Sequence, residues 1–397
     1  MPAGYVLHRD MIREVKYMAE TSQLKPVAPA GQEDLSQYVA PPTVAQLMWQ
    51  RFRRNKLAIY AGIVLIIFYT VAIFAGFFAP YYVDTTHSKF PGVGPNPIHI
   101  RDKQGKWHWP PFVYGYVSKL DLESYKRVFT IDTTVTYAVR FFAKGDEYTL
   151  LGSIKADRHL FVVDEPGKVF LMGTDTLGRD LFSRIIYGAR ISLTVGLVGV
   201  FMSLVIGSLI GVMAGFYGGV FDNISMRIVE VLLAFPQIPL WMALAAALPP
   251  NLDSIKVYFG ITVVLSFIGW GGLARQVRAK VLALRDTDMV IAARVCNCSD
   301  LRIVVRHLFP NTLSHVIVSA TLAIPGMILG ETTLSFLGLG IRPPMTSWGL
   351  LLSEAQATRV LLQQPWLLWP IVPVMITAIS FNLLGDGFRD AADPFAY

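Results

Sequence analysis

The chain has 397 residues, of which 53% are hydrophobic and only 16% are charged. Soluble domains carry roughly 25% charged residues, so lipid is the expected solvent for much of this surface. The composition excludes a disordered chain, and two cysteines exclude a disulfide-stapled secreted scaffold. The formal net charge of +7 is expected to mark the cytoplasmic flanks of a membrane protein, with membrane lipid and not nucleic acid as a partner.

A first transmembrane helix is predicted over residues 57–80. An uncharged run extends from Leu57 to Val83, which is longer than the roughly 20 residues that span a bilayer. A basic cluster precedes it, formed by Arg51, Arg53, Arg54 and Lys56. Because basic residues favour the cytoplasmic side, residues 1–56 are predicted to be a cytoplasmic N-terminal segment.

Residues 81–172 differ from the segments around them. About a quarter of them are charged, as in a soluble domain. Four runs rich in β-branched and aromatic residues indicate strands, at residues 133–142, 148–154, 159–163 and 169–172. The segment is therefore predicted to be a small β-containing extracytoplasmic insertion.

Five further spans are predicted within residues 173–397, at 189–215, 224–248, 257–274, 312–337 and 366–388. The fold class is thus an all-α polytopic membrane protein with six transmembrane helices, one N-terminal and five in a core. Alternation places both termini in the cytoplasm, together with the connection 275–310. That connection carries seven basic and three acidic residues, as the positive-inside rule requires. Three arginines on the outer side weigh against this topology and are interpreted as interfacial: Arg179, Arg184 and Arg190.

Glycine and proline punctuate the predicted spans. Gly207, Gly211 and Gly215 recur every four residues, which predicts close approach of a neighbouring helix. Pro236 and Pro239, and Pro325 in the fifth span, would interrupt the helical hydrogen bonds. Such kinks are compatible with a cavity or with packing alone.

No phosphate-binding loop, HExxH or GxSxG motif occurs, so no catalytic, cofactor-binding or metal-binding residue is predicted in this chain. Polar residues at membrane depth are instead candidates for a path or a helix contact. Glu331 is the best of these candidates, and either role, in a path or in a helix contact, is open to it. Gln237, which lies between two prolines, is a further candidate. For Glu230 a pair with Arg227 on the same helical face is favoured. An intramembrane enzyme that uses Glu331 or Asp386 remains an alternative without a second catalytic partner.

The connection 275–310 is predicted to be a helix-turn-helix on the cytoplasmic face. Its two helical stretches break near residues 297–299 and end at Pro310. Asn297 suits the left-handed turn that the break requires, and Asp300 could cap the second helix. A rigid, basic and partly apolar protrusion is a plausible docking lever for a cytoplasmic partner.

These residues resemble the permease subunits of bacterial ABC importers, specifically the second permease of the oligopeptide, dipeptide and nickel branch. The connection is similar to that family's EAA loop at Ala292, Ala293, Arg294, Leu301, Arg302, Arg306, His307, Pro310 and Asn311. Ile291 stands where the name-giving Glu often lies, and Asn297 replaces the usual Gly. Further similarity covers segments 51–58, 173–190, 333–349 and 382–387, whereas residues 81–172 replace a shorter loop.

The resemblance implies a multi-pass protein of the bacterial cytoplasmic (inner) membrane. It implies a second homologous permease, two cytoplasmic ATPase subunits that bind the EAA-like loop, and an extracytoplasmic substrate-binding protein. ATP and Mg would then be bound by the ATPase partners, and this chain would hold no cofactor. Peptides are the expected cargo, and nickel, a glycan or another small solute is the alternative. A membrane anchor whose outer insertion binds a ligand is a further alternative, but it has no need of a coupling loop.

Overall fold

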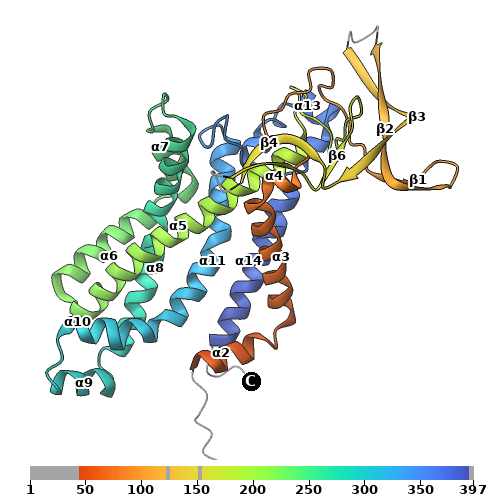
Figure 1. Cartoon of the computed structure of the whole chain (residues 1–397). Coiled ribbons are helices and arrows are strands. Elements are labelled where there is room, and N and C mark those ends of the chain that lie inside the picture. The colour runs from red at the N-terminus through yellow and green to blue at the C-terminus, as the bar shows by residue number, and fades with distance from the viewer. Residues whose placement is uncertain (1–43, 122–125, 151–153, 393–397) are drawn as a thin grey trace, which may run out of the picture. The chain divides into compact units, whose positions relative to one another are not determined.

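The computed structural model describes residues 44–121, 126–150 and 154–392. The chain divides into two compact units, Met1–Leu47 and Met48–Tyr397. Only residues 44–47 of the first unit are described, at the start of helix α2 (Val44–Phe52). Most of the predicted segment 1–56 therefore lies outside the described residues, and the elements below belong to the second unit (Figure 1).

Five helical stretches of the described residues are long and apolar enough to cross a membrane. They contain α3 (Lys56–Ile73), α5 (Leu181–Tyr217), α8 (Ser254–Leu284), α11 (Phe309–Phe336) and α14 (Ile371–Ala392). A bent pair, α6 (Gly219–Ala234) and α7 (Gln237–Ala246), makes a sixth if it is counted as one span. The predicted fold class of a helical membrane protein with a small β insertion is confirmed.

The predicted span 224–248 is not a continuous helix. Its two halves meet at 92° across a break at Phe235 and Pro236. Phe235 has an extended backbone with φ −81° and ψ 140°, the conformation that a following proline favours. The proline predicted to kink the span instead divides it, and Gln237 becomes the first residue of α7.

The glycine row of α5 packs directly on α8, as the spacing predicts. A Cβ on Gly207 would lie 2.8 Å from the carbonyl oxygen of Trp270, and one on Gly211 would lie 2.6 Å from that of Ala274. Real Cβ atoms do not approach so closely, so these positions require glycine for the two backbones to meet. Two buried clusters flank this contact, one around Leu193, Leu265 and Ile328 and the other around Val277, Val281 and Ile303.

Shorter helices complete the core. α9 (Asp288–Val295) and α10 (Asp300–Ile303) follow α8, and a π-helical turn (η2, Val304–Leu308) joins α10 to α11. The prediction that the helix ends at Pro310 is wrong. The π turn shifts the hydrogen bonding, with the Phe309 N–H bonded to the Val304 carbonyl, and Pro310 then occupies the first turn of α11, where its missing N–H is tolerated. α12 (Trp348–Ser353), α13 (Thr358–Gln363) and the 3-10 turn η3 (Pro365–Leu368) lie between α11 and α14.

The insertion contains two antiparallel sheets. The larger has the order β1-β2-β3-β6, formed by β1 (His99–Arg101), β2 (Trp107–Asp121), β3 (Lys126–Phe141) and β6 (Phe161–Val163). β4 (Lys144–Leu150) pairs with β5 (Ile154–Arg158). The strand predicted at 169–172 is absent, because the Phe170 carbonyl accepts from the N–H groups of Asn96 and Gly173 and not from a strand ladder. Val169 and Phe170 are nevertheless fully buried in the core of the insertion.

The insertion is fastened to the helical core at the end of α4 (Ala75–Phe78). The Leu160 N–H donates to the Phe77 carbonyl at 2.7 Å. His159 is fully buried, with its ring nitrogens 2.5 Å from the Ala79 carbonyl and 2.8 Å from the Asp146 carbonyl. Because His159 and Ala79 are fully buried where they meet, the insertion forms a fixed part of this unit.

Candidate functional site

Residues 285–310 of the predicted connection 275–310 form a rigid helix-turn-helix, because α8 continues to Leu284. Asn297 adopts φ +57°, and the Cys298 N–H closes the turn on the Ala293 carbonyl at 3.0 Å. The left-handed turn predicted for Asn297 is therefore present, since asparagine tolerates this conformation better than most residues. Ser299, and not Asp300, occupies the N-cap position of α10, and it makes no side-chain capping bond.

Packing fixes this loop on the ends of α5 and α8. Val290, Ala293 and Ile303 are buried with Phe216 and Val281 in one apolar cluster. The Arg294 guanidinium lies over the Phe216 ring, 5.5 Å from its centroid. A displacement of the loop therefore has to move the ends of both long helices, because a close-packed cluster transmits displacement.

The outer surface of the loop is apolar and basic. Val295 and Leu301 are 81% and 72% exposed, and Ile291 and Val305 are also exposed. We call these four residues the loop patch. Among the predicted coupling residues, Ala293 is buried, His307 is half-buried, and the exposed ones are Ala292, Arg294, Asn297, Asp300, Leu301, Arg306 and Pro310. The sequence predicts that this segment is exposed, but it does not separate Ala293 from its exposed neighbours.

An ion cluster accounts for two of the arginines that weighed against the topology. Arg184 is 1% exposed. Its Nη1 donates to Asp175 at 2.7 Å, and its two terminal nitrogens bind Glu354 at 2.7 and 2.9 Å. Arg179 contacts the same two carboxylates at 2.7 and 3.1 Å. Both positive charges are thus compensated inside the protein. Arg190 donates instead to the carbonyls of residues 72 and 73.

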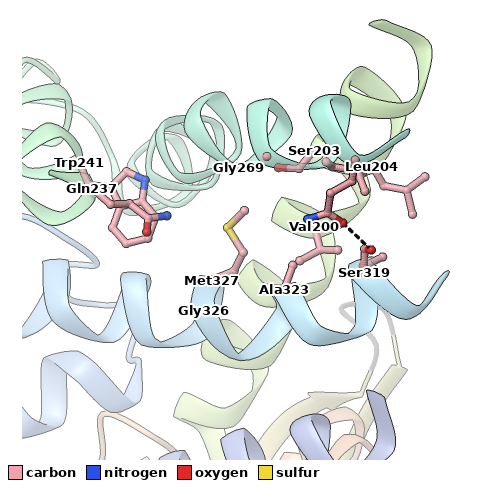
Figure 2. A pocket seen from close by; sticks show the side chains of 14 residues that line it. Val200, Ser203, Leu204, Gln237, Trp241, Gly269, Ser319, Ala323, Gly326 and Met327 are labelled. Atoms are coloured by element: carbon pink, nitrogen blue, oxygen red, sulfur yellow. Dashed lines mark hydrogen bonds between the residues drawn. The ribbon is translucent and has the colours of Figure 1, made fainter. Parts of the chain in front are cut away.

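A pocket opens between α5, α7, α8 and α11, and we call it the core pocket (Figure 2). Its volume is about 250 Å³. The lining side chains are small, apolar or neutral polar: Val200, Ser203, Leu204, Gln237, Trp241, Gly269, Gly272, Leu273, Gln276, Ser319, Ala320, Ala323, Gly326 and Met327. Ser319 donates to Gln276 Oε1 at 2.8 Å across two helices (Figure 2).

Of the three predicted path or contact residues, Gln237 lines the core pocket. Glu230 forms an exposed pair with Arg227, Nη1 to Oε2 2.9 Å. Glu331 is fully buried and accepts hydrogen bonds from Ser192 at 2.9 Å and Ser335 at 2.7 Å. Glu331 on α11 therefore makes a contact with α5 through Ser192. Its carboxylate oxygens are buried and do not face a transport path.

Nothing in the described residues resembles a metal centre. No group of three or more His, Cys, Asp or Glu side chains that could hold an ion occurs in residues 44–121, 126–150 and 154–392. Cys296 and Cys298 are free. The core pocket was not predicted from the sequence, although its lining glycines and alanines recur at helical spacing.

Two family models match the chain. The model described as binding-protein-dependent transport system inner membrane component matches residues 207–396. The model of the N-terminal transmembrane domain of oligopeptide transport permease C matches residues 43–91. The strands of the insertion, residues 99–163, lie between the two matched ranges.

Individual relatives extend the similarity. The glutathione transport system permease protein GsiD of Escherichia coli is 33% identical over 346 residues, which are 87% of this chain and 89% of the relative. The oligopeptide transport system permease protein OppC of Haemophilus influenzae is 43% identical over 223 residues, 56% of this chain and 69% of the relative. Among solved structures, the inward-facing MetNI methionine ABC transporter covers 54% of this chain and 98% of its own, with 18% identity and a TM-score of 0.42.

Proposed function

The chain belongs to the family of binding-protein-dependent transport system inner membrane components, and from this premise we propose that it is the permease subunit of an ATP-driven peptide importer. It is a multi-pass inner membrane protein and a transport subunit by family. The observation that carries the proposal is the rigid loop that ends in the exposed loop patch. A membrane anchor or an intramembrane enzyme has no use for such a loop.

The loop patch is the proposed docking surface for two cytoplasmic ATPase subunits. Exposed apolar side chains with arginines beside them are typical of the centre of a protein interface. ATP and Mg would be bound and hydrolysed in those partners, whose closure would displace the loop and, through its packed cluster, the ends of α5 and α8. This chain itself makes and breaks no covalent bond in the proposal.

A second, homologous permease is proposed to close the transport path. The core pocket is open on one side, where Gln237, Gln276 and Gly326 are exposed. A partner helix packed against that side would enclose a path between the two subunits. Alternation between outward-facing and inward-facing states would then follow from the ATPase cycle.

Both termini are proposed to be cytoplasmic, with the loop on the same side and the insertion outside. The basic surplus of the loop supports this orientation. The ion cluster removes the main objection to it, since Arg179 and Arg184 present no uncompensated charge to be held inside.

Peptides are the proposed cargo, as they are in the name of the OppC relative. The core pocket supports peptides over nickel, because its lining holds no His, Cys, Asp or Glu side chain, the ligands that nickel would need. A glycan or another small solute remains the second candidate, since neutral hydrogen-bonding groups suit it too.

Reconstitution tests the proposal. We expect this chain, co-expressed with its cognate second permease, ATPase subunits and binding protein, to purify as one complex. In liposomes the complex should accumulate radiolabelled tri-alanine only with Mg-ATP. The importer assignment would be refuted if the chain purified without ATPase subunits, or if uptake by the complex did not depend on ATP. Uptake of a glycan but of no peptide would show that peptides are not the cargo.

The insertion is proposed to dock the extracytoplasmic binding protein. Trp107 and Trp109 are 71% and 82% exposed on β2, and exposed aromatic side chains are typical interface anchors. Removing residues 90–165 would cut through a buried cluster that contains Val93 and Phe161, so point variants are the cleaner test.

We expect Trp107→Ala with Trp109→Ala to weaken docking of the binding protein at least about tenfold, because two large anchors are lost. Ile154→Ala is the matched control, since Ile154 is 57% exposed on β5 of the same insertion. Docking is measured by surface plasmon resonance on the reconstituted complex. Equal affinities for the double variant and wild type would contradict the proposal that the insertion docks the binding protein.

A further inference from the structure

Two glycines of the core pocket pack against no other part of this chain in the described residues. Gly272 on α8 and Gly326 on α11 lie inside helices with negative φ. A Cβ at either position would meet no atom within 4 Å. A Cβ on Gly269, in contrast, would lie 2.4 Å from Met327 Cε. Glycine inside a helix is destabilising relative to alanine, so Gly272 and Gly326 keep space and bare backbone open toward the pocket at a cost to the fold.

One side chain that lines the same space carries an unpaired hydrogen-bond donor. Trp241 is 5% exposed, and its indole Nε1 is buried without a hydrogen-bond partner in the described structure. Its side chain lines the core pocket (Figure 2). A buried donor left without an acceptor is costly. A ligand acceptor that reached this nitrogen from the pocket would satisfy it.

The remaining polar groups of the pocket are primary amides and hydroxyls. Gln237 lies four residues before Trp241 on α7, so the two side chains share one helical face. Gln276 accepts from Ser319 through Oε1, which leaves its NH₂ group available. No charged side chain lines the pocket. A neutral pocket of this kind pairs with neutral amide groups, and it offers no partner to a charge of either sign.

We propose that the core pocket binds the backbone amide groups of the cargo during passage. The Trp241 indole N–H donates to a peptide carbonyl, and the Gln237 amide pairs with the adjoining backbone group. The cleared space at Gly272 and Gly326 accommodates the chain. The inference rests on the proposed import of peptides and adds that the pocket recognises groups that every peptide shares, whatever its side-chain charge.

Uptake by the reconstituted complex tests this inference with three probes: tri-alanine, tri-lysine and tri-glutamate. Trp241→Phe keeps the aromatic ring and removes the donor. We expect it to raise the half-saturating concentration roughly three- to tenfold, by a similar factor for all three probes. Trp270→Phe is the matched control. Trp270 is also nearly buried, on α8, but it does not line the pocket, and this variant should transport like wild type.

Gly326→Leu provides a second measurement that does not depend on Trp241. No described atom lies within 4 Å of the new Cβ, so we expect this chain to fold while uptake of every probe falls at least tenfold, and retention of the second permease during purification is the control for assembly. Unchanged uptake in Trp241→Phe and Gly326→Leu would overturn the inference, as would a loss confined to one probe. A wild-type complex that takes up no peptide with Mg-ATP would instead refute the proposed function, and the inference with it.

Discussion

Replacing Leu301 with Asp is expected to abolish ATP-driven uptake while the chain stays folded in the membrane. Leu301 is 72% exposed and belongs to the loop patch, so a carboxylate there would be desolvated in the proposed ATPase groove. Central apolar anchors contribute about 2 kcal/mol or more to an interface, which is roughly 30-fold in affinity. Retention of the ATPase subunits during purification and ATP-dependent uptake of tri-alanine are the two measurements.

The substitution is mild for the fold of this chain. Leu301 lies in the first turn of α10, where a negative charge is favourable to a helix. Leu362→Asp is the matched control, because Leu362 is 78% exposed on α13, away from the loop. If ATPase subunits were retained equally by the Leu301→Asp, Leu362→Asp and wild-type chains, the loop patch would not be the docking surface.

Ala293 illustrates the limit of choosing such variants from a sequence. It belongs to the segment that resembles the EAA loop, yet it is only 7% exposed and packs in the cluster beneath the loop. Ala293→Glu would therefore bury a charge and disturb the loop itself. Its neighbour Ala292 is exposed. Alanine occurs at both kinds of position, so only the packing of α9 on α5 and α8 distinguishes them.

The spans were predictable because a chain segment that crosses the lipid bilayer has to form a long apolar helix. The left-handed turn at Asn297 was predictable for a similarly local reason, since few side chains tolerate positive φ. The 92° angle between α6 and α7, in contrast, could not be predicted from the sequence. Pro236 explains why the helix breaks, but the direction taken by α7 depends on the packing of Trp241 in the core.

The glycines show the same division between local and non-local information. Gly211 and Gly272 are both helical glycines in apolar spans, and a sequence pattern treats them alike. In the structure a Cβ on Gly211 would lie 2.6 Å from a backbone oxygen of α8, whereas a Cβ on Gly272 would meet nothing. One glycine permits helix contact and the other leaves a pocket open. The distinction depends on which helix lies opposite, and no short-range pattern records that.

The ion cluster is the largest feature that the sequence did not predict. Asp175 and Glu354 are far apart in sequence, and the cluster becomes visible only when α12 meets the start of α5. Counted singly, Arg179 and Arg184 contradicted the charge rule for outer segments. Paired with two carboxylates they contribute no net charge there, so the rule and the structure agree.

Replacing Arg184 with Met is expected to destabilise the chain by about 3–5 kcal/mol, the usual cost of removing one partner of a buried ion pair. Arg184 is 1% exposed, and its Nη1 lies 2.7 Å from both Asp175 and Glu354. Without it, two carboxylates share the single guanidinium of Arg179. The midpoint of thermal unfolding of the detergent-solubilised complex should fall, by on the order of 10 °C.

Two further variants separate this effect from a general cost of losing an arginine. Arg227→Met removes the same group from the pair with Glu230, whose two side chains are 80% and 58% exposed, and should cost only about 0–1 kcal/mol. Glu354→Gln added to Arg184→Met removes one of the stranded charges and should recover part of the lost stability. If Arg184→Met and Arg227→Met lowered the midpoint equally, or if the added Glu354→Gln lowered it further, the cluster would not act as a compensated unit. The outer arginines would then again argue against the proposed orientation.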